Sequence, residues 1–180
     1  MKKLLLFGIL IAATTAFAQD KLVSKTGKIT FEASVPAFEE VKGVNSGVTF
    51  VLNPKTGEVA SQAMLKGFRF KVALMEEHFN ENYVESDKYP KSTFKGKIDN
   101  FDVTALTATA KEYTIKGKLE MHGKTKDIST IAKIRKTDAG IEIISNFTVN
   151  ADDFGIAIPS VVKSKVSNKV HVKTEFTVKQ

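Results

Sequence analysis

Residues 113–125 read YTIKGKLEMHGKT, and their pattern decides the fold class of the chain. Tyr113, Ile115, Leu119 and Met121 fall on one side of an extended chain, while threonine, lysine and glutamate fill the other side. Alternation with a period of two residues is typical of a β-strand with one buried and one solvated face. The His-Gly-Lys-Thr that follows is short and polar and contains glycine, so the stretch predicts a strand that ends in a tight turn.

The same alternation recurs along most of the chain. Further strands are expected at residues 29–35, 48–52, 68–72, 141–149 and 170–178, with polar, glycine-bearing turns at residues 53–57 and 136–140. Roughly eight such strands in one domain predict a sandwich or a barrel, and a barrel has no exposed edges and can enclose a ligand. Periodicity alone does not choose between the two.

One segment follows a helical period instead. Within residues 74–85, Met75, Phe79 and Tyr83 recur at intervals of four among acidic and amide residues. This spacing predicts an amphipathic helix of about three turns. The helix should end before Pro90, because proline forces the residue before it towards an extended conformation. A lone helix in a barrel is expected to cover one end.

The N-terminus has the three-part pattern of a secretory signal peptide: Met1-Lys2-Lys3, an apolar run over residues 4–13, and Ala16-Phe17-Ala18. The apolar run is well short of the ~20 residues that cross a bilayer, so it does not predict a stable membrane insertion. We expect cleavage after Ala18, an exported protein in the periplasm or secreted, and one domain over residues 19–180. Loss of Lys2 and Lys3 lowers the formal charge from +7 to +5.

Composition excludes several classes of function. The chain has no cysteine, so neither a disulfide nor a lipid anchor on cysteine is expected. Its basic residues are spread along the chain without a basic stripe that carries aromatics, so no nucleic acid partner is expected. The three histidines lie on different elements without the spacing of a metal site, and His122 and His171 fall on faces predicted to point outward. We therefore expect no metal, no cofactor and no catalytic residues.

Aromatic residues are abundant, with thirteen phenylalanines and three tyrosines, and several fall on predicted inward faces. In a sandwich these side chains would fill the core. In a barrel they can line a pocket for an apolar ligand, whose transfer from water is worth about 0.8 kcal/mol per buried CH₂ group.

Three motifs in order resemble the YceI-like family: His78-Phe79-Asn80 with Tyr83 and residues 88–94 (KYPKSTF), residues 117–126 (GKLEMHGKTK), and Phe147 and Val149 leading to residues 153–156 (DFGI). The resemblance covers nearly all of the chain beyond the N-terminal segment. It implies an extended lipocalin-like barrel, in the periplasm or secreted, that carries or stores a polyisoprenoid or an isoprenoid quinone in its interior. The family carries no set of catalytic residues.

The fold class predicted from these observations is all-β: a single eight-stranded antiparallel lipocalin-like β-barrel with one short helix capping it. The partner is expected to be a long apolar lipid such as a polyisoprenoid. The residues expected to bind it are Phe50, Phe68, Phe70, Phe79, Tyr83, Tyr89, Phe94, Ile115, Leu119, Met121 and Phe147. A polar headgroup could meet His78 or Arg69 near solvent, because an unpaired charge is costly to bury.

Two other functions remain open at this point. The first is an enzyme that acts on a lipid in the same cavity, with His78 and either Glu77 or Asp153 as acid and base. The second is a non-lipid interaction protein whose barrel is filled by its own side chains. The sequence also leaves a homodimer open.

Overall fold

The computed structural model describes residues 21–179, and its strands account for most of them. The expected signal peptide, residues 1–18, lies outside this part of the chain. The strands are β1 (Leu22–Ser34), β2 (Lys42–Leu52), β3 (Glu58–Met64), β4 (Arg69–Phe70), β5 (Lys91–Ile98), β6 (Lys111–Met121), β7 (Lys124–Thr137), β8 (Gly140–Asn150) and β9 (Val166–Val178).

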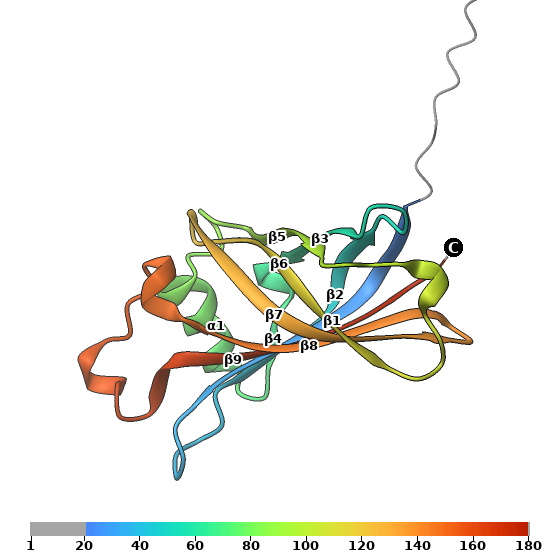
Figure 1. Cartoon of the computed structure of the whole chain (residues 1–180). Coiled ribbons are helices and arrows are strands. Elements are labelled where there is room, and N and C mark those ends of the chain that lie inside the picture. Colours follow the sequence, from blue (N-terminus) through green and yellow to red (C-terminus); the bar gives the residue numbers. More distant parts are fainter. Residues whose placement is uncertain (1–20, 180) are drawn as a thin grey trace, which may run out of the picture.

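All neighbouring strands pair antiparallel, in the order β1-β9-β8-β7-β6-β5-β3-β2, and β1 also pairs with β2. The last pairing joins the two ends of the sheet, so these eight strands form a closed barrel (Figure 1). The two-residue β4 adds to β2 alone, at Gly43 and Val44. The predicted eight-stranded antiparallel barrel is confirmed, and closure settles the choice between barrel and sandwich.

The short helical elements lie near the ends of the barrel. They are η1 (Leu65–Gly67), α1 (Ala73–His78), η2 (Phe79–Tyr83), η3 (Val103–Ala105), η4 (Ala151–Phe154) and η5 (Ser160–Val162). The predicted helix over residues 74–85 corresponds to α1 and the π-helical turn η2, which follow each other without a break. In Figure 1, α1 lies at the same end as the orange-red segment between β8 and β9, with η3 at the opposite end.

One predicted strand is shorter than expected. Residues 68–72 alternate like a strand, but only Arg69 and Phe70 pair with a neighbour, and Phe68 ends the 3₁₀ turn η1. The turn is held by the side chain of Asn45, whose Nδ2 donates to the carbonyl oxygen of Met64 at 2.9 Å. The chain therefore leaves β3 and enters α1 within a few residues.

The barrel is solid at the end that carries η3. Leu52, Ile98, Ile134 and Val178 have no exposed surface there, and Leu106 next to η3 is 4% exposed. Burying a side chain of this kind contributes roughly 1.5–3 kcal/mol relative to leaving it in water. Side chains therefore fill the interior of the barrel at this end.

A candidate ligand cavity in the barrel

The half of the barrel nearer α1 encloses a cavity of about 400 Å³. This volume falls in the range of pockets that hold small-molecule ligands, roughly 300–1,000 Å³. The inward faces of the strands form its side walls, and residues of α1, η2 and η4 line it at the end nearer α1. None of the fully buried residues at the η3 end lines it, so the cavity has a closed floor.

The paired strands β8 and β9 show how the interior changes from floor to mouth. Directly opposed inward residues are Ile141 and Val178, then Ile143 and Phe176, then Ser145 and Thr174, then Phe147 and Val172, then Val149 and Val170. The first pair belongs to the solid core, and the other four pairs line the cavity. Because inward residues recur every second position, each step along the strand adds one ring to the wall.

Four phenylalanines form an aromatic cluster on the wall beneath α1. Phe31, Phe68, Phe70 and Phe79 have ring centroids 5.2–5.6 Å apart in five of their pairings, mostly edge to face. Such arrangements add about 0.5–1.5 kcal/mol per pair to the burial of the rings. The cluster fixes the helix to the barrel and presents aromatic surface to the cavity.

A second aromatic pair lies nearer the floor. The rings of Phe50 and Phe176 stack with centroids 4.2 Å apart and an interplanar angle of 10°. Gly27 makes this possible, because a Cβ at that position would collide with the ring of Phe176. The bulge of β1 next to Gly27 therefore serves the packing at the base of the cavity.

The wall carries one buried polar pair. Ser145 and Thr174 are 5% and 8% exposed, and their hydroxyl oxygens lie 2.8 Å apart. One of the two hydroxyls donates its hydrogen to the other, and the accepting hydroxyl keeps its own hydrogen free to donate elsewhere. Ser61, Thr93 and Thr130 also line the cavity, so this pair is one of several places where a ligand inside the barrel would meet a hydroxyl group.

The mouth of the cavity carries charged and titratable side chains near solvent. Glu39, His78 and Lys165 all line it and all are exposed. Glu77 and Asp153 do not line it, and Asp153 lies 3.8 Å from Lys126 in an ion pair. Neither of the two residues predicted to act with His78 as acid and base therefore reaches the cavity.

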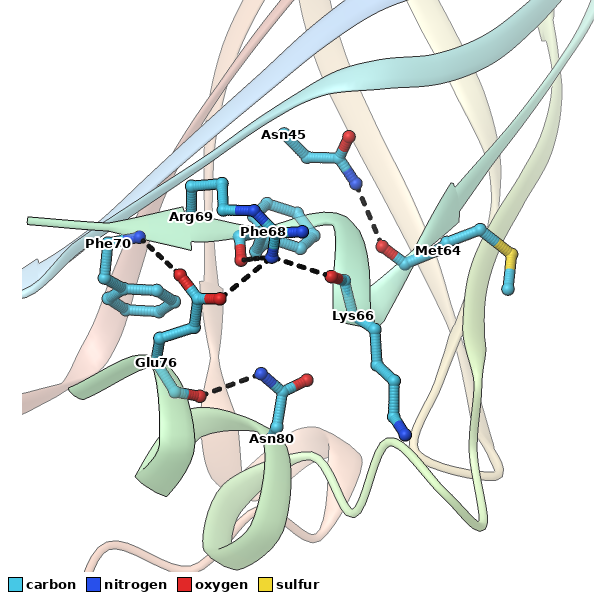
Figure 2. A network of polar contacts seen from close by, with 8 residues as sticks. All are labelled: Asn45, Met64, Lys66, Phe68, Arg69, Phe70, Glu76 and Asn80. Atoms are coloured by element: carbon cyan, nitrogen blue, oxygen red, sulfur yellow. Dashed lines mark hydrogen bonds and ion pairs between the residues drawn. The ribbon is translucent and has the colours of Figure 1, made fainter. Parts of the chain in front are cut away.

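Arg69 does not line the cavity, although the sequence suggested it for a headgroup. Its guanidinium donates to the carboxylate of Glu76 at 2.9 Å and to the carbonyl oxygens of Lys66 and Phe68 (Figure 2). The other oxygen of Glu76 accepts from the backbone N–H of Phe70 at 3.1 Å. Arg69 and Glu76 thus fasten β4 to α1, so this cation is already engaged outside the barrel.

Tyr89 also lies outside the cavity, because it packs on His122 in the β6–β7 turn. The Nε2 of His122 lies 2.7 Å from Glu85 Oε2, and its Nδ1 lies 3.0 Å from the carbonyl oxygen of Phe154. The prediction that His122 points outward is wrong, because its side chain is only 12% exposed. The β6–β7 turn places the imidazole against the side chain of Glu85. Lys88 belongs to the same group of side chains. Its pKa is raised mainly by a hydrogen bond with Tyr89 and to a smaller extent by the negative charge of Glu85.

The structure brings eleven of the thirteen predicted site residues to the cavity wall or mouth. They are Phe50, Phe68, Phe70, His78, Phe79, Tyr83, Phe94, Ile115, Leu119, Met121 and Phe147. Their role in binding a ligand remains a prediction. Sequence reasoning missed Phe31 and Phe176 as wall residues, although both stand at inward positions of alternating strands that it had identified.

Residues 21–179 contain no group of three or more His, Cys, Asp or Glu side chains placed to hold a metal ion. In the same part of the chain, no helix combines the length and the apolar character needed to span a membrane.

The fold and the cavity together define the structural class: a lipocalin-like antiparallel β-barrel that is closed at one end and encloses an apolar cavity at the other. The chain belongs to the YceI family, because the model of the YceI-like domain matches residues 15–178. Comparison with curated protein sequences gives no match.

Several solved structures share the fold. A polyisoprenoid binding domain from Saccharophagus degradans is 16% identical, with a TM-score of 0.74 over 88% of this chain and 97% of that one. BcnA from Burkholderia cenocepacia is 15% identical, with a TM-score of 0.69 over 86% and 96%. The YCEI protein of Campylobacter jejuni is 18% identical, with a TM-score of 0.59 over 81% and 90%.

Proposed function

We propose that this protein binds a long apolar lipid in its cavity, with a polyisoprenoid or an isoprenoid quinone as the ligand class, and that it carries or stores this lipid without catalysing a reaction. The observation that carries the proposal is the cavity of about 400 Å³ in the barrel interior, whose wall is apolar and aromatic apart from a few hydroxyl groups. Each buried CH₂ group of a ligand would contribute about 0.8 kcal/mol. Tight binding therefore needs no charged contact.

The preference for an isoprenoid over other apolar lipids draws on the family. The Saccharophagus degradans relative is described as a polyisoprenoid binding domain. The cavity mouth supports a ligand with one polar end, because its charged side chains gather where solvent can reach them. An isoprenoid with its chain inside the barrel and its polar end at the mouth satisfies both features.

The N-terminal pattern supports export, so we propose that the protein works in the periplasm or outside the cell. A catalytic function has less support, since Glu77 and Asp153 do not reach the cavity that His78 borders. A barrel filled by its own side chains would have no such cavity.

Native mass spectrometry of the protein purified from its own cell envelope tests this proposal, followed by organic extraction and identification of the lipid. We expect one isoprenoid molecule for each chain. A protein that leaves the envelope without lipid, and that also fails to take up isoprenoids or quinones in a binding assay, would refute the proposal.

A further inference from the structure

Exposed apolar side chains surround the mouth of the cavity. The rim consists of residues 35–41 between β1 and β2, residues 71–78 at α1, and residues 156–167 leading into β9; each segment contributes side chains to the cavity lining. Six large apolar side chains stand out as exposed in residues 21–179, and three of them are on the rim. Val161 is 82% exposed, Leu74 is 56% exposed and Phe38 is 49% exposed.

These three side chains stand on the segments that border the cavity. Val161 precedes the lining residue Val162, Leu74 precedes Met75, and Phe38 precedes Glu39. Figure 1 shows α1, the blue β1–β2 connection and the orange-red segment before β9 at the same end of the barrel. Each of the three segments that border the mouth therefore carries an exposed apolar side chain at this end of the barrel.

The rim segment with the most exposed side chain is also cationic. Residues 156–170, which comprise this segment and the next three residues of β9, contain Lys163, Lys165 and Lys169 and no acidic residue. Among the ion pairs of residues 21–179, none involves these three lysines. An apolar tip flanked by unpaired lysines suits a surface that offers negative charge above an apolar layer.

We infer that the rim docks on membranes that contain anionic phospholipids, with Val161, Leu74 and Phe38 in the headgroup region and the mouth facing the bilayer. The inference deepens the proposed function and rests on it for its purpose: a ligand too apolar for water can pass between bilayer and cavity without crossing solvent. The other two rim segments carry Glu39, Glu40, Glu76 and Glu77, and Glu40 and Glu76 are paired with Lys42 and Arg69. Residues 156–170 are therefore the part of the rim that anionic headgroups attract. A second copy of the chain that sets its acidic segments against these lysines is the alternative that the vesicle experiment separates.

Vesicle co-sedimentation tests docking without any isoprenoid, using the protein as its host exports it and variants processed alike. The probes are vesicles of phosphatidylcholine with and without phosphatidylglycerol. We expect the wild type to bind the anionic vesicles at least tenfold more tightly than the neutral ones. Each lysine near an anionic surface contributes a factor on the order of five. Lys163→Glu and Lys169→Glu should each reduce binding by at least that factor.

The apolar contribution is tested by Val161→Asp and Leu74→Asp, and we expect each to weaken binding at least tenfold. Ile131→Asp is the matched control, because Ile131 is 57% exposed on β7 away from the rim. Lys133→Glu on the same strand is the control for charge. Both controls should stay within twofold of the wild type. Equal losses in the rim variants and the controls would overturn the inference.

The experiment also separates docking from ligand binding. A wild type that takes up a short isoprenol in solution but does not sediment with anionic vesicles, including one that only self-associates, would overturn docking and leave the proposed function in place. A wild type that sediments through the rim but takes up no isoprenol would keep docking and refute the proposed function.

Discussion

Ala63→Phe should block the cavity. Ala63 lies on β3, is 3% exposed, and lines the cavity with no side chain beyond its methyl group. A phenyl ring at this position would occupy space that the ligand chain otherwise fills. It would exclude from the cavity about as many ligand carbon atoms as the ring contains. At about 0.8 kcal/mol per CH₂ group, the loss is roughly 3–5 kcal/mol. This free energy corresponds to a dissociation constant raised about a hundredfold or more.

The assay is a titration of the purified protein with a short isoprenol, alongside urea unfolding to verify that the variant folds. The ring enters existing space, so we expect a change in the free energy of unfolding smaller than the roughly 1–3 kcal/mol of an overpacked core. Ala60→Phe is the matched control, because Ala60 is on the same strand but outside the cavity lining. If folded Ala63→Phe binds as tightly as the wild type, the ligand does not occupy the cavity.

Three further predictions concern the walls and the surface of the barrel. Ser145→Ala or Thr174→Val alone leaves one buried hydroxyl without its partner and should cost about 1–3 kcal/mol in urea unfolding, whereas the double variant should cost less than the sum. His122→Ala removes contacts to two other segments and should lower the free energy of unfolding by about 1–3 kcal/mol, while exposed His171→Ala should change it by less than about 0.5 kcal/mol. A hydrogen bond from Lys173 lowers the pKa of the Glu175 carboxyl below its ordinary 4.5. The ionised carboxylate therefore stabilises the fold fully above pH 4.5, and this stabilisation is lost as the pH falls through the lowered pKa. In a plot of the free energy of unfolding against pH, Glu175→Gln should flatten the acid side of the curve.

The strands predicted from the sequence are those whose inward positions are mostly apolar. In β6 and β8 the alternation fixes both the strand and its buried face, which is why Ile115, Leu119 and Phe147 were placed on the cavity wall. In β7 the pattern is broken, because Thr130 lines the cavity while Ile131 is 57% exposed to solvent. A reading based on alternation alone therefore did not identify this strand.

Contacts between distant segments could not be read from local patterns. Continued alternation past Met121 puts His122 on the solvent face, but the turn gives His122 a positive φ of 51° and brings its ring to Glu85, 37 residues away. The sequence suggested that Arg69 is a free cation near the mouth. Its ion pair with Glu76 forms only because α1 packs back against β4. Both corrections arise from tertiary packing, which period and composition do not encode.

Photo-crosslinking tests the central claim most directly, which is that the apolar chain of the ligand lies inside the barrel. The protein is loaded with an isoprenoid that carries a diazirine in its chain, irradiated and digested, and the labelled residues are identified by mass spectrometry. We expect labels on inward residues of several strands, such as Leu119, Met121 and Phe147, and their loss in Ala63→Phe. Labels confined to outward residues such as Ile131 would contradict it.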